Sequence, residues 1–207
     1  MIRTLLLAAS IGLTGCVNHT EGTTEAEVKD VTETPATTPA PAPAPAPAGD
    51  MLRANAEDSK IEWVGAKITK SHPGGFNDFT VEATVDGGAL TAINSTVQIA
   101  SMFSDSAKLT GHLLDADFFD AASFATASFT STSIVADGDK HKVTGVMEMH
   151  GVKKELSFPA TITVTDGKAT FDAEFNINRS DWGITYPGRP DDAIKEQVVI
   201  KLDLNLS

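Results

Sequence analysis

Hydrophobic and polar residues alternate in short runs through the second part of the chain, beginning near Ser59. In the first of these runs, Ile61 and Trp63 occupy alternate positions. Alternation of this kind predicts strands with one buried face, because successive side chains of a strand point to opposite faces of a sheet. We expect strands at residues 60–69, 77–86, 89–100, 126–136, 140–149, 152–165, 168–178 and 194–206.

Turn-forming residues separate the runs, in the segments Asp86-Gly87-Gly88, Asp137-Gly138-Asp139, His150-Gly151 and Asp166-Gly167. Asp-Gly and Gly-Gly pairs tolerate the positive φ values of tight hairpin turns, so the sheet should be largely antiparallel. The predicted fold class is therefore all-β, a barrel or sandwich of roughly eight strands. The interior of such a barrel is filled by side chains or holds one small ligand.

Residues 104–122 interrupt the alternation with a helical pattern. Ser104 is a candidate N-cap, and Leu109 and Leu113 are spaced i,i+4, as on one face of a helix. We expect a short helical insertion here, which could plug one end of a barrel.

The aromatic residues that could build a core lie beyond residue 60, and all ten Phe fall between Phe76 and Phe175. These side chains are candidates for lining the barrel interior. Packing of a core without a ligand is the more common reason for buried Phe, so the spacing alone leaves a ligand cavity and a filled core both open.

The first fifteen residues have the form of an export signal, with Arg3 followed by an apolar run at residues 5–13. This run is much shorter than the roughly 20 residues of a membrane-spanning helix. The segment Leu13-Thr14-Gly15-Cys16 resembles the lipobox of bacterial lipoproteins, which implies removal of the signal peptide 1–15 and lipidation of Cys16. The alternative is an ordinary signal peptide with an incidental cysteine.

Several acyl chains, such as palmitate, anchor a protein stably at about 0.8 kcal/mol per buried CH₂ group. Lipidation of Cys16 would therefore suffice to hold the protein at a membrane. Residue Val17 is not the Asp that often signals retention in the inner membrane. We expect a cell-envelope protein in the outer membrane, facing the periplasm.

The remainder of the N-terminal part, residues 16–50, is polar and then alternates Pro and Ala over residues 39–48. We interpret residues 16–50 as a lipidated N-terminus with a disordered tether, because such a sequence offers little to a core and favours extended polyproline II geometry. The folded domain is assigned to residues 51–207.

Formal net charge is −12, from 16 Lys and Arg against 28 Asp and Glu. A nucleic-acid site requires a basic surface, so nucleic acid is not an expected partner. The acidic balance also disfavours electrostatic docking on anionic lipid headgroups. Membrane attachment is therefore expected through the acyl anchor alone, and a homodimer is one candidate for the oligomeric state.

Several segments between residues 59 and 206 resemble the YceI-like family and occur in that family's order. They are Gly75-Phe76-Asn77-Asp78-Phe79, Gly111-His112-Leu113, Asp115-Ala116-Asp117-Phe118-Phe119-Asp120, Phe129-Thr130-Ser131-Thr132, Val143-Thr144-Gly145, Met149-His150-Gly151-Val152 and Ile177-Asn178-Arg179-Ser180-Asp181-Trp182-Gly183. Departures include Ala125, where a Pro is common, and Val146, where an Asp often follows Val-Thr-Gly.

This resemblance implies an eight-stranded, lipocalin-like antiparallel barrel with an elongated apolar cavity. It also implies a ligand such as a polyisoprenoid, an isoprenoid quinone or a fatty-acid amide. The candidate ligand-binding residues are Ile61, Trp63, Phe76, Phe79, Phe103, Leu109, Leu113, Phe119, Phe124, Phe129, Arg179, Trp182 and Tyr186.

Catalytic chemistry is not expected. The chain has no HExxH pair, Ser/His/Asp constellation or phosphate loop, so neither an enzyme nor a metal site nor another cofactor is predicted beyond a bound apolar lipid. Arg179 and Asp181 are interpreted as a structural ion pair closing the last loop, with orientation of a ligand headgroup as the alternative. The predicted function is binding, storage or transfer of a long apolar lipid; the alternative is a structural or protein-interaction lipoprotein with a filled barrel.

Overall fold

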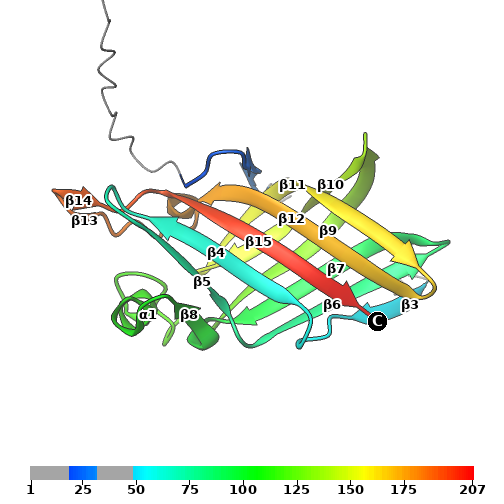
Figure 1. Ribbon diagram of the computed structural model, residues 1–207, viewed down its shortest axis with the longest axis horizontal. Helices are drawn as coiled ribbons and strands as arrows, with labels where there is room; N and C mark the ends of the chain where they lie inside the picture. Colours follow the sequence, from blue (N-terminus) through cyan, green and yellow to red (C-terminus); the bar gives the residue numbers. More distant parts are fainter. Residues whose placement is uncertain (1–18, 32–48) are drawn as a thin grey trace, which may run out of the picture.

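The computed structural model describes residues 19–31 and 49–207, which form a strongly curled sheet with one α-helix (Figure 1). Its long strands, in chain order, are β4 (Lys60–Ala66), β5 (Ser71–Phe76), β6 (Phe79–Asp86), β7 (Ala89–Gln98), β9 (Thr126–Asp137), β10 (Lys140–Met149), β11 (Val152–Thr165), β12 (Lys168–Asn178) and β15 (Gln197–Leu206). The short strands β3 (Asp50–Arg53) and β8 (Met102–Ser104) form the two edges.

The order across the sheet is β3-β6-β7-β9-β10-β11-β12-β15-β4-β5-β8, and neighbours along this path run antiparallel. The edge strands β3 and β8 are not paired with each other along this path. Instead, Ala54 forms an isolated bridge to Leu206 at the end of β15. The predicted all-β, antiparallel barrel architecture is confirmed, as an incomplete barrel with more strands than expected.

The main strand that the sequence patterns missed is β5, which contains Pro73, Gly74 and Gly75. Pro and Gly weaken a strand prediction because Pro lacks an N–H and Gly has no side chain to pack. Gly74 is nevertheless required in this strand, because an added Cβ atom would lie 2.3 Å from both the Phe103 carbonyl oxygen and the Trp63 ring. The predicted strand 60–69 accordingly ends at Ala66 and turns back into β5.

The predicted helical insertion is present as α1 (Ala107–Leu114), which lies at one end of the barrel (Figure 1). Its N-cap is Ser106 rather than the predicted Ser104. The Ser104 hydroxyl instead accepts a hydrogen bond from the Ser106 N–H at 3.2 Å and lies 3.0 Å from the Thr110 hydroxyl. The segment after the helix returns Phe118 and Phe119 towards the barrel core.

The prediction for residues 16–50 differs from the structure in the described part, residues 19–31. Two short strands occur there, β1 (Thr24–Glu25), which pairs parallel with β12, and β2 (Glu27–Asp30), which pairs antiparallel with β11. Sequence patterning missed them because the segment is mostly polar and buries only Ala26. Cys16 and the Pro/Ala run at 39–48 lie outside the described residues.

The placement of these strands changes the role expected for the Pro/Ala run. β2 precedes it and β3 follows it, and both strands pair within the barrel sheet. The run therefore joins two strands of the same barrel and does not separate the barrel from the N-terminus.

Gly145 of β10 allows a test of packing in the barrel wall, with Gly111 of α1 as its uncrowded control. A Cβ atom on Gly145 would lie 2.5 Å from both the Phe129 ring and the Thr130 carbonyl oxygen, whereas one on Gly111 in α1 meets nothing within 4 Å. Gly145→Ala is expected to lower the free energy of unfolding by about 1–3 kcal/mol through overpacking. Gly111→Ala should raise it by about 0.5–1 kcal/mol through helix propensity. Urea unfolding of the two variants tests both signs, and equal effects would contradict this account of Gly145.

Candidate functional site

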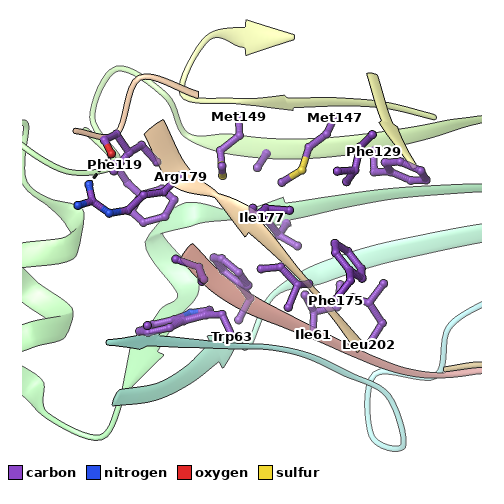
Figure 2. A pocket seen from close by; sticks show the side chains of 18 of the residues that line it. Ile61, Trp63, Phe119, Phe129, Met147, Met149, Phe175, Ile177, Arg179 and Leu202 are labelled. Carbon is purple, nitrogen blue, oxygen red and sulfur yellow. Dashed lines mark hydrogen bonds between the residues drawn. The ribbon is translucent and has the colours of Figure 1, made fainter. Parts of the chain in front are cut away.

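A cavity of about 250 Å³ occupies the barrel interior. One water requires only about 10–15 Å³ of such space, so the cavity is far larger than a packing defect. Side chains from every long strand and from α1 line it, and nearly all of them are apolar. Figure 2 shows Phe129, Met147 and Met149 on one side of the cavity, with Ile61, Trp63 and Leu202 on the other. An apolar, concave surface of this kind favours an apolar occupant over water.

Many of the predicted site residues line this cavity. They are Ile61, Trp63, Phe76, Leu109, Leu113, Phe119, Phe129 and Arg179. Leu109 and Leu113 come from α1, so the helix contributes to the cavity wall at its end of the barrel. Trp63 is buried, and its indole N–H has no hydrogen-bond partner among the described residues. Packing against Gly74 rather than a polar contact therefore holds the ring in place.

The other predicted site residues lie outside the cavity lining. Phe103 is on the edge strand β8 and is 39% exposed, whereas Phe79 is partly buried against the core. Phe124 packs on the His150 ring at 4.6 Å in the β10–β11 turn. Trp182 is fully buried and donates to the Met147 carbonyl at 3.3 Å, and Tyr186 packs edge-on against His112.

Several other apolar residues that line the cavity were not among the predicted site residues. They are Met147 and Met149 of β10, Leu156 of β11, Ile177 of β12, and Ile200, Leu202 and Leu204 of β15. Phe158, Phe171 and Phe175, which were among the Phe residues expected to line the interior, do line the cavity. The period-2 pattern contained the necessary signal, because Leu202 and Leu204 of β15 flank the exposed Asp203. Alternation marks these positions as one face of a strand, but it does not tell whether that face lines a cavity or packs into a filled core.

Arg179 lies at one end of the cavity (Figure 2), with its guanidinium carbon 6.0 Å from the centre of the Phe118 ring. Its buried guanidinium donates hydrogen bonds to backbone carbonyls of the last loop, those of Lys195 at 3.1 Å, Ile184, Tyr186 at 2.9 Å and Ile194 at 3.5 Å. The predicted ion pair between Arg179 and Asp181 is therefore wrong. Arg179 does hold the last loop, but through backbone carbonyls. Burial lowers the pKa of this guanidinium, and the negative charge of Glu196 partly opposes that shift.

Several polar side chains near the same end of the cavity form pairs. Lys67 binds Asp192, and the His72 ring lies 2.7 Å from Asp105. The hydrogen bond from His72, with a further one from Lys70, lowers the pKa of Asp105. The hydrogen bond from Lys67 likewise lowers the pKa of the Asp192 carboxyl. These pairs partly neutralise the charges around this end of the cavity.

The histidines take structural positions. His112 lies 3.0 Å from Asp117 just after α1, and His150 (φ 51°) forms the β10–β11 turn with Gly151 (φ 73°). The turn predicted at His150-Gly151 is confirmed. Within residues 19–31 and 49–207, no group of three or more His, Cys, Asp or Glu is arranged to hold a metal ion. In the same ranges, no helix is long and apolar enough to cross a membrane.

A small antiparallel β-barrel around an apolar cavity defines a lipocalin-like fold. The YceI-like domain matches residues 52–206, and the chain therefore belongs to the YceI-like family. A UPF0312 protein of Pseudomonas fluorescens is 39% identical over 158 residues, which cover 68% of this chain and 82% of the relative.

Solved structures agree on the fold. BcnA of Burkholderia cenocepacia superposes with a TM-score of 0.68 at 24% identity, over 73% of this chain and 98% of BcnA. A polyisoprenoid binding domain from Saccharophagus degradans gives a TM-score of 0.60 at 14% identity, over 76% of this chain and 97% of that domain. The predicted family and barrel fold are thereby confirmed.

Proposed function

We propose that this protein binds one long apolar lipid without covalent chemistry and stores or transfers it in the bacterial cell envelope. The observation that carries the proposal is the cavity of about 250 Å³, lined almost entirely by apolar side chains. The polyisoprenoid binding domain of Saccharophagus degradans, which has the same fold, supports a ligand of this kind. Polyisoprenoids, isoprenoid quinones and fatty-acid amides are the candidate ligands.

Chain burial would supply most of the affinity. At about 0.8 kcal/mol per CH₂ group, ten buried methylenes contribute some 8 kcal/mol before the cost of ordering the chain. The competing proposal, a filled barrel that serves only as a rigid head for a protein partner, requires a core without such a cavity. The cavity therefore favours lipid binding over that alternative.

Attachment to the membrane is proposed through a lipidated Cys16, most simply in the outer membrane facing the periplasm. His19 follows three residues later, and its Nε2 lies 2.8 Å from the Gln197 carbonyl oxygen. Three extended residues span at most about 10 Å. A Cys16 anchor would thus hold the Gln197 end of the barrel, which is also the Arg179 end, close to the bilayer that supplies or receives the lipid.

Tryptophan fluorescence offers a direct test, because Trp63 lines the cavity whereas Trp182 does not. Titration of the lipid-free Cys16→Ser protein with an isoprenoid quinone should produce saturable quenching. Trp63→Phe should lose most of that quenching while still retaining the quinone in equilibrium dialysis. A folded protein that neither quenches nor retains the quinone or a fatty-acid amide would refute the proposal.

A further inference from the structure

A slot interrupts the barrel wall between β11 and β12. These neighbours pair only from Thr161↔Asp172 to Thr165↔Lys168. Beyond that point, the first half of β11 continues along β10 and the second half of β12 continues along β15, so the two strands part. The two sides of the slot, which we call its lips, are the first half of β11 and the second half of β12. Each lip presents a strand edge whose backbone groups need another partner.

The N-terminal segment fills this slot. We call residues 23–30, which contain β1 and β2, the strap. On one lip, Leu156 and its neighbours pair with β2, and on the other lip Phe175 and Asn176 pair with β1. The Ala26 N–H donates to the Asn176 carbonyl at 2.9 Å. The buried Asn176 side chain in turn donates to the Thr23 hydroxyl at 3.0 Å.

The strap lies between two parts of the cavity wall. Leu156 and Phe158 on one lip and Phe175 and Ile177 on the other all line the cavity. Ala26 of the strap is buried in the same core cluster, and Val28 packs against it. Removal of the strap would therefore open the cavity along its side, between the two pairs of lining residues.

The strap is held more weakly than the strands it joins. It buries only Ala26, and its ion pairs, Lys154 to Asp30 and Lys142 to Glu27, involve exposed carboxylates. Exposed ion pairs contribute little stability, and segments with few buried contacts open locally before the whole fold does. By contrast, the Arg179 guanidinium holds the loop at the cavity's end by donating hydrogen bonds to several carbonyls of that loop. The strap also lies outside residues 52–206, the part that matches the family domain.

We propose that the strap is a removable wall of the cavity, and that its detachment opens a lateral portal through which a long lipid enters and leaves. This inference rests on the proposed lipid-binding function. A lateral opening lets a chain pass broadside between the lips, whereas entry at an end would require threading its whole length. Detachment breaks the strand pairing of β1 with β12 and of β2 with β11 and leaves the remaining barrel pairing unchanged.

A reversible cross-link tests the portal. Lys29 of the strap and Glu155 of β11 are register partners on the outer surface, so Lys29→Cys with Glu155→Cys can form a disulfide that fixes the strap to the β11 lip of the slot. The background is the full chain with Cys16→Ser, which removes the other thiol. Glu174→Cys with Lys201→Cys is the matched control, because it joins register partners of the continuously paired β12 and β15. A third variant, Ala26→Asp, weakens the strap by placing a carboxylate at its buried position.

The readout is the rate of isoprenoid quinone uptake, followed by Trp63 quenching. Oxidation of the strap cross-link should slow uptake at least tenfold, reduction should restore it, and the control cross-link should have no effect. Ala26→Asp should accelerate uptake. Equal rates in the oxidised and reduced strap variant, or unchanged uptake in Ala26→Asp, would overturn the portal while leaving lipid binding intact. Absence of quinone binding in the parent protein would instead count against the proposed function.

Discussion

Arg179→Ala is expected to lower the free energy of unfolding by about 3–5 kcal/mol. The substitution removes a buried guanidinium that satisfies the carbonyls of Ile184, Tyr186, Ile194 and Lys195. An unsatisfied buried acceptor costs about 1–3 kcal/mol, and water entering the loop recovers part of that loss. At about 2–4 °C per kcal/mol for a domain of this size, the melting temperature should fall by roughly 10 °C.

Arg189, exposed on the short strand β13 (Gly188–Arg189), provides the control for removal of a positive charge. Arg189→Ala should change stability by no more than about 0.5 kcal/mol. Arg179→Lys keeps the charge but lacks the planar fork of donors, so it should recover only part of the lost stability. Full recovery in Arg179→Lys would show that charge, rather than the set of carbonyl hydrogen bonds, makes this residue important.

Ser95→Trp should block lipid binding while leaving the barrel folded. Ser95 of β7 lines the cavity and is the register partner of Phe129. A Trp side chain here would fill part of the cavity that the lipid chain is proposed to occupy. Exclusion of three to four methylenes costs about 3 kcal/mol at about 0.8 kcal/mol each, which is more than a hundredfold in Kd.

Ser133→Trp is the matched control, because Ser133 is exposed on β9 and lies outside the cavity lining. Its Kd for the same quinone should match that of the parent protein. Circular dichroism and thermal melts establish that both variants are folded. Undiminished binding by a folded Ser95→Trp protein would place the ligand outside this cavity.

The sequence predicted those strands whose alternating apolar and polar residues are bounded by turn-forming residues. The β10–β11 hairpin is one such case, because His150-Gly151 supplies two positive φ angles between two alternating runs. β5 could not be predicted in this way, since Gly74 and Gly75 are dictated by the approach of Trp63 and Phe103 from other strands. Tertiary packing thus overrides local propensity at that strand.

The strap could not be predicted for a related reason. Ala26 and Val28 are too few to mark a buried segment, and they pair with β11 and β12 only because those strands part. For the cavity, aromatic residues such as Trp63 and Phe129 were found, but Phe124 and Trp182 pack elsewhere. Sequence could identify which residues are apolar, whereas the curvature of the sheet decides which of them face the cavity.

Native mass spectrometry of the Cys16→Ser protein, purified from a bacterial host without detergent, tests lipid binding most directly. Lipid binding in the cavity predicts a stoichiometric apolar adduct that organic extraction identifies as a single long-chain lipid class, and whose occupancy falls in Ser95→Trp but not in Ser133→Trp. A protein that is consistently empty, and that also fails to take up isoprenoid quinone or fatty-acid amide when these are supplied, would contradict it.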